Sequence, residues 1–146
     1  MSQDTTEHIN KVQARMLEIQ QHIVRRSLLH DASKLEEPEL SGFAGLSAKL
    51  SELVYGSDEY RAALVEAKPV IDHHYAANDH HPEHYPDGIA GMSLLSLLEM
   101  VADWKAATER VKQGSMEQSL AVNVKRFDLD PQLASIIANT VKEMGW

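Results

Sequence analysis

The sequence predicts an all-α protein, a single-domain bundle of five to seven helices over residues 1–146. Apolar residues recur at spacings of three and four along most of the chain, which is the period of an α-helix with one buried face. No segment shows the alternating pattern of a half-buried strand. The length of 146 residues is typical of one domain and is sufficient to bury a core.

The N-terminal half of the chain contains several helical segments. An apolar stripe from Ile9 to Ile23 predicts a helix with one buried face, and a second segment runs from Val24 to Leu29. Pro38 permits a new start, and apolar residues from Phe43 to Val54 predict the next helix. The stretch Gly56 to Asp58 predicts a break followed by a helix cap.

The C-terminal half continues the helical pattern around one irregular stretch. A helix is expected from Tyr60 to Tyr75, with Pro69 bending or restarting it. Residues 78–91 are rich in proline and glycine and predict a loop. A strongly apolar helix follows from Met92 and closes near Gly114, and Asp130-Pro131 predicts the start of the last helix.

Composition excludes several classes of protein. Lys plus Arg number 14 and Asp plus Glu number 22, so the net charge of −8 argues against a broad nucleic-acid surface. The absence of cysteine excludes disulfides, thiolate zinc sites and cysteine nucleophiles. No apolar run approaches the roughly 18 residues of a membrane span, and the first ten residues carry no signal-peptide pattern. We therefore expect a soluble, cytoplasmic protein.

Histidine is the unusual residue. The chain has 8, and five of them lie between His73 and His84. Imidazole and carboxylate groups are ligands suited to divalent iron, manganese, zinc, cobalt or nickel. The candidate residues for such a site and its surroundings are His8, His30, Asp31, Lys34, His73, His74, Asn78, His80, His81, Glu83, His84, Glu99 and Asp103.

Each group of candidates has a structural alternative. The His30-Asp31 pair stands at the edge of an apolar segment, where a metal would offset the cost of burying it, but it can also be a helix end and a cap. Glu99 and Asp103 share one helix face, which can equally be a solvated stripe.

The histidine cluster sets a condition on the local structure. His74 and His81 are seven residues apart, about 10.5 Å along a straight helix, which is too far for one ion. The helix must therefore end near Asn78 if both histidines serve one site. The alternative is a histidine-rich surface loop that binds metal only adventitiously.

Together these residues resemble the HD-domain superfamily of metal-dependent phosphohydrolases. The segment Leu28–Lys34 is similar to the His-Asp doublet of that superfamily, His8 resembles its first ligand, and Asp103 resembles its last. His80–Glu83 followed by Asp87-Gly88 is similar to a stretch of the cyclic-dinucleotide branch, although the Gly-Tyr-Pro signature of that branch is missing.

The chain also resembles a small bacterial and phage HD-like family of unassigned function. The pattern of that family runs His-Asp-x-Ser-Lys, then His-x3-Asn-x-His-His-Pro-Glu, then Glu-Met-x-x-Asp-Trp. This sequence supplies His74, Asn78 and His80–Glu83 for the second motif and Glu99–Trp104 for the third.

The resemblance implies a set of roles. One or two divalent ions (Mn, Fe, Co, Ni or Zn) would be held by His8, His30, Asp31, His74, His80, His81 and Asp103. Asp31, Lys34 and Glu83 would be catalytic, and an acid among Glu36, Glu37 and Glu39 would orient water. Asn78, Glu99, His73 and His84 would support the ligands or face the substrate.

One tension concerns the first ligand. His8 and His30 are 22 residues apart, about 33 Å along a single helix, so they can share an ion only if the chain folds back between them. We expect this turn near Gln20–His22, and His22 is a rival first ligand.

The expected function is hydrolysis of a nucleotide or another small phosphate ester by a metal-activated water. The alternatives are a di-iron oxygenase of the HD-like type and a non-catalytic helical module with a structural metal. The sequence leaves the oligomeric state open, a homo-oligomer included.

Overall fold

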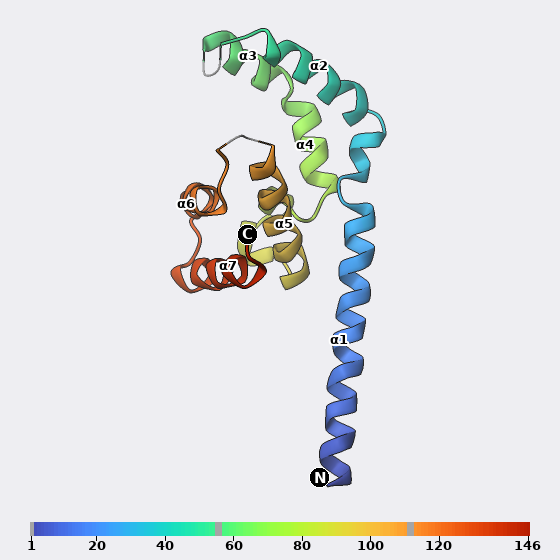
Figure 1. The fold of residues 1–146 in the computed structure, drawn as a ribbon. Coiled ribbons are helices and arrows are strands. Elements are labelled where there is room, and N and C mark those ends of the chain that lie inside the picture. Colours follow the sequence, from blue (N-terminus) through green and yellow to red (C-terminus); the bar gives the residue numbers. More distant parts are fainter. Residues whose placement is uncertain (1, 55–56, 111–112) are drawn as a thin grey trace. The chain divides into compact units, whose positions relative to one another are not determined.

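The computed structural model describes residues 2–54, 57–110 and 113–146, and they are all-helical, as predicted (Figure 1). Contacts divide the chain into two compact units, Met1–His30 and Asp31–Trp146, and each is described by itself. Strands are absent from the described ranges. The seven α-helices of these ranges are α1 (Gln3–Leu29), α2 (Glu39–Ser51), α3 (Asp58–Glu66), α4 (Lys68–Ala77), α5 (Leu94–Glu109), α6 (Met116–Arg126) and α7 (Pro131–Met144).

The first unit is a single helix, α1. The Ser2 side chain caps it by accepting a hydrogen bond from the Thr5 N–H, and the helix ends at Leu29 because His30 has left the helical region. The expected turn at Gln20–His22 is wrong. Gln, Glu, Leu and Arg are good helix formers, and neither glycine nor proline interrupts the segment.

The apolar stripe of α1 was expected to be buried. Within its own unit the helix has no second element to pack against, and none of its residues is buried. The exposed stripe consists of Ile9, Val12, Met16, Ile19 and Ile23.

The first part of the second unit contains α2, α3 and α4, together with a short 3-10 helix, η1 (Ala32–Leu35). Helix α2 packs on η1, α3 and α4. Gly42 permits this close approach, since a Cβ atom there would lie 2.5 Å from Val70 Cγ2. The predicted cap before α3 is Ser57, which accepts from the Tyr60 N–H, whereas Gly56 lies outside the described residues.

Pro69 restarts the helix, as one of the two predicted outcomes. Helix α3 ends at Glu66, and Pro69 occupies the first turn of α4, where its missing N–H is not needed. Helix α4 ends at Ala77, and Asn78 caps it in an extended conformation. The irregular stretch that follows contains two 3-10 turns, η2 (Pro82–His84) and η3 (Gly88–Gly91).

The hydrophobic core of the second unit lies among α5, α6 and α7, which pack in series (Figure 1). Trp104 on α5 stacks on Phe127 at the end of α6, with ring centroids 6.2 Å apart and planes 4° from parallel. Helix α6 is not among the helices predicted above, although Ser115 is a typical cap and Leu120 and Val124 share one face of the helix. The buried core residues are Met100, Val101, Trp104, Met116, Leu129 and Ile137.

The predicted start of the last helix offers a test of local stability. The Asp130 carboxylate accepts from the backbone N–H groups of Gln132 and Leu133, and Pro131 occupies the first helical position. Replacing Asp130 with alanine is expected to lower the free energy of unfolding by about 1 kcal/mol. Urea denaturation followed by circular dichroism measures this change, and Asp130→Asn, which can still cap, should lose much less.

Length and hydropathy together rule out a membrane-crossing helix within the described ranges.

Candidate metal centre

Four of the predicted ligands lie together in the second unit. Asp31 precedes η1, His74 is in the last turn of α4, and His80 and His81 precede η2. One side-chain donor atom from each residue lies within 4.8 Å of the others. His74 and His80 are buried, at 4% and 2% exposure, while Asp31 and His81 are partly exposed.

The distances between the donor atoms fit a shared metal ion. Asp31 Oδ1 lies 3.5 Å from His74 Nε2 and 3.6 Å from His80 Nε2. His74 Nε2 lies 2.9 Å from His81 Nε2. Two ligands of a tetrahedral ion with bonds of about 2.0–2.1 Å are about 3.3 Å apart. The four atoms are therefore spaced as metal ligands are spaced, with only small adjustments needed.

Glu39 holds His74 in the orientation that this site needs. The His74 Nδ1–H group donates to Glu39 Oε2 at 2.8 Å, which leaves the lone pair on Nε2 directed at Asp31 and His81. Glu39 is fully buried, and it also accepts from His73 Nδ1 at 2.8 Å and from Ser33 Oγ at 2.9 Å. Although burial raises the pKa of Glu39, these hydrogen bonds lower it below the ordinary 4.5, so the carboxylate is charged.

His80 has an equivalent support. Its Nδ1 atom lies 3.2 Å from Glu99 Oε1 on α5, so Nδ1 carries the proton and Nε2 presents a lone pair toward Asp31. Ligating histidines in metal sites commonly donate their second N–H to a carboxylate, which fixes the tautomer and raises the basicity of the ring. Both His74 and His80 show this arrangement.

The arrangement therefore brings acceptor atoms together. The Nε2 atoms of His74 and His80 and the Oδ1 atom of Asp31 all direct lone pairs at one small region. Asp31 Oδ1 and His80 Nε2 are also shielded from solvent. Closely spaced acceptors repel one another unless a cation lies between them. The donor set thus fits a metal ion.

His81 completes the group as a neutral ring. Burial is the largest of the effects that lower the pKa of His81 from 6.5 to about 4. Lys34 and Arg126 lower it further by smaller amounts, whereas Asp31 opposes them. At neutral pH the ring is uncharged and therefore able to ligate.

Asp31 occupies an unusual backbone conformation. Its φ of 54° and ψ of 20° lie in the left-handed region, which aspartate and asparagine adopt more readily than most residues other than glycine. This conformation begins η1 and directs the two carboxylate oxygens differently. Oδ1 faces the histidines, while Oδ2 accepts from Lys34 Nζ at 2.6 Å.

Asn78 connects the site to η1. The side-chain amide of this buried residue donates to Ser33 Oγ at 2.7 Å and to the His74 carbonyl oxygen at 2.8 Å. The Ser33 hydroxyl in turn donates a hydrogen bond to Glu39 Oε2 at 2.9 Å. A chain of hydrogen bonds therefore fixes the end of α4 against η1. The helix ends where the sequence condition required, so that His81 reaches back to His74.

The remaining predicted residues of the histidine cluster have other contacts. His73 is half-exposed and holds Glu39 rather than the ligand group. His84 Nδ1 donates to the Tyr75 carbonyl oxygen at 2.9 Å, which ties η2 to α4. Glu83 accepts from Arg126 Nη2 at 2.7 Å. Glu39, considered above as an acid that orients water, instead has its oxygens on His73, His74 and Ser33.

Three expected ligands do not join this four-residue group. Asp103 lies on α5 and is absent from the donor groups found in the described ranges. His8 and His30 belong to the first unit, as part of α1 and as its C-cap. Because α1 is continuous, these two histidines are about 33 Å apart along one helix and cannot hold one ion between them, and the rival His22 lies on the same helix.

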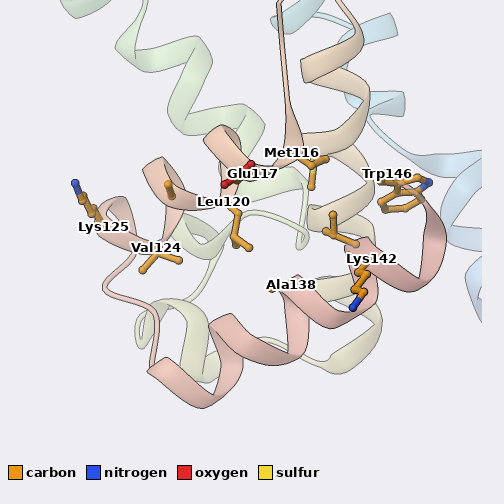
Figure 2. Close-up of a pocket in the computed structure, with 10 residues that line it drawn as sticks. Met116, Glu117, Leu120, Val124, Lys125, Ala138, Lys142 and Trp146 are labelled. Carbon is orange, nitrogen blue, oxygen red and sulfur yellow. The ribbon is translucent and has the colours of Figure 1, made fainter.

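An apolar pocket elsewhere in the second unit is separate from these residues. It has a volume of about 700 Å³ and lies between α6 and α7, lined by Leu120, Val124 and Val141 with Trp146 near one end (Figure 2). None of its lining residues belongs to the candidate metal centre.

The described residues thus define an all-helical protein with a buried histidine–aspartate group that can hold a metal ion. The chain belongs to the family described as "Family of unknown function (DUF5662)", whose model matches residues 1–143. Comparison with curated proteins and with solved structures gives no match.

Proposed function

We propose that the protein is a metal-dependent phosphohydrolase of the HD type, acting on a nucleotide or another small phosphate ester. The observation that carries the proposal is the group of Asp31, His74, His80 and His81, in which two histidines are oriented by buried or partly buried carboxylates. Burying a carboxylate costs free energy. In metal sites, carboxylates of this kind fix the tautomer of the histidines that bind the ion.

The donor set favours a transition metal. Three imidazole nitrogens and one carboxylate oxygen suit Zn, Mn, Fe, Co or Ni, whereas Mg and Ca prefer oxygen ligands alone. When bound, such an ion lowers the pKa of a coordinated water and draws charge from a phosphoryl oxygen. The four residues account for one ion, and a second ion would need further ligands.

Lys34 would bind the phosphate in the proposed reaction. Its ammonium group lies on the Oδ2 face of Asp31, and the side chain is 44% exposed, so an anion can reach it from solvent. The Phe43 ring lies below the same ammonium group, 5.6 Å away. Lys34 would therefore bind a phosphoryl oxygen as a point charge next to the ion.

Reconstitution with single metals tests the proposal. The purified protein is stripped with a chelator, loaded separately with Mn²⁺, Co²⁺, Zn²⁺ or Fe²⁺, and assayed for phosphate release from nucleoside monophosphates and p-nitrophenyl phosphate. We expect metal-dependent release that the variant His80→Ala lacks. His22→Ala, which removes an exposed histidine of α1, is the matched control and should keep the activity.

Two results would contradict the proposal. Iron-dependent oxygen consumption without phosphate release would identify an oxygenase. Stoichiometric metal binding that raises the melting temperature, without turnover of any phosphate ester, would identify a structural metal.

A further inference from the structure

A second cation stands near the metal centre and has no role in the function proposed above. Arg126, the last residue of α6, reaches Glu83 in η2, and its Nη2 atom lies 2.7 Å from Glu83 Oε1. The same nitrogen lies 3.5 Å from the Tyr75 hydroxyl oxygen. These contacts join α6 to the segment that carries the histidines.

The guanidinium group is held in a fixed position. Phe127 places its ring under it, with Arg126 Cζ 4.6 Å from the ring centroid, and Phe127 in turn stacks on Trp104 of the core. A guanidinium held by a carboxylate on one edge and by an aromatic ring on one face loses little freedom when it binds a ligand.

The position of Arg126 relates it to the ligand group. The Tyr75 ring contacts the His81 ring, with centroids 5.0 Å apart, while the Tyr75 hydroxyl points to Arg126. The Tyr75 side chain therefore contacts both Arg126 and His81, which is a predicted metal ligand.

Part of the Arg126 guanidinium group is available to bind an anion. The two polar contacts of Arg126 within the described residues use only Nη2, and the side chain is 52% exposed. Nη1 therefore keeps both of its hydrogens for donation to an oxygen of a phosphate or a carboxylate. Lys34 is already next to Asp31, so the two cations serve different places.

We propose that Arg126 binds a second anionic group of the substrate, so that the preferred substrate is a phosphate ester carrying a further phosphate or carboxylate. This inference rests on the proposed function, in which the ion and Lys34 bind the phosphate that is hydrolysed. Arg126 does not touch that phosphate and determines specificity.

Equilibrium binding separates the inference from turnover. The Mn²⁺-loaded protein is titrated by calorimetry with glycerol 3-phosphate, glycerol 1,3-bisphosphate and 3-phosphoglycerate. These probes carry one phosphate, two phosphates, and one phosphate with one carboxylate. We expect at least one doubly anionic probe to bind about tenfold more tightly than glycerol 3-phosphate, and the tighter one identifies the second group.

Variants assign the difference to Arg126. In Arg126→Ala we expect the doubly anionic probe to bind only about as tightly as glycerol 3-phosphate. The affinity for glycerol 3-phosphate itself should change little. Lys125→Ala is the matched control, because it removes the adjacent positive charge of α6 from a side chain that lines the apolar pocket instead. It should keep the preference, and circular dichroism checks that both variants are folded.

The outcomes distinguish the two proposals. A preference that is equal in the wild type and Arg126→Ala, or absent in the wild type, overturns the role of Arg126. Phosphate release from every tested ester could fail while the preference still depends on Arg126. That result contradicts hydrolysis and supports an anion site at Arg126.

Discussion

Replacing Asp31 by asparagine is expected to abolish tight metal binding while leaving the fold intact. Asparagine has the same size and tolerates the left-handed conformation at this position, so the backbone keeps its path. The variant loses the charged oxygen that faces His74 and His80. The affinity for Mn²⁺ or Zn²⁺ should fall by more than the 10–100-fold that loss of an outer hydrogen-bond partner causes.

A matched control separates the ligand role of Asp31 from its ion pair with Lys34. Asp72 on α4 also pairs with a lysine, with its Oδ1 atom 2.7 Å from Lys68 Nζ, but it belongs to no donor group of the described residues. Asp72→Asn should therefore leave the metal affinity unchanged. Equal affinity of Asp31→Asn and the wild type, measured by competition with a chromogenic chelator, would refute the candidate centre.

Changing Glu39 is expected to affect both stability and metal binding. The buried carboxylate accepts three hydrogen bonds, from His73, His74 and Ser33. Glu39→Ala leaves these donors without their acceptor and should lower the free energy of unfolding by about 3 kcal/mol. Glu39→Gln keeps the shape but accepts with only one oxygen, and it should lose less stability.

Measuring the metal affinity of Glu39 variants distinguishes a residue that positions His74 from one that only stabilises the fold. In Glu39→Gln the His74 ring is no longer fixed in one tautomer, and metal affinity is expected to fall about 10–100-fold. Glu36→Gln removes an exposed acid three residues earlier and is the control. If folded Glu39→Gln bound metal as tightly as the wild type, the positioning role of Glu39 would be excluded.

The helical class could be predicted because it depends on local patterns. The three- and four-residue periodicity, the Asp130-Pro131 start and the restart at Pro69 act within one or two turns. The turn at Gln20–His22 was wrong because it was inferred from the need to bring His8 to His30, while the local residues favoured a helix.

Only the part of the candidate site that depends on local features of the sequence could be predicted. His74, His80 and His81 stand out by composition, and the end of α4 at Asn78 follows from their spacing. The roles of Glu39 and Arg126 depend on contacts with His74 and Glu83 across 35 and 43 residues, and no local pattern announces such contacts. Glu99 was recognised as a residue on the same face as Asp103, but its contact with His80 needed the packing of α5.

The four donors come from segments far apart in the chain, which links occupancy to the melting temperature. A bound ion ties Asp31 to His81 and so acts as a reversible crosslink around the 49 intervening residues. At an ion concentration 100 times the dissociation constant, binding adds about 2.7 kcal/mol to the stability of the folded state. For a chain of this length each 1 kcal/mol raises the melting temperature by about 2–4 °C. A simple heating curve can therefore rank Mn²⁺, Fe²⁺, Co²⁺, Ni²⁺ and Zn²⁺ before any substrate is known.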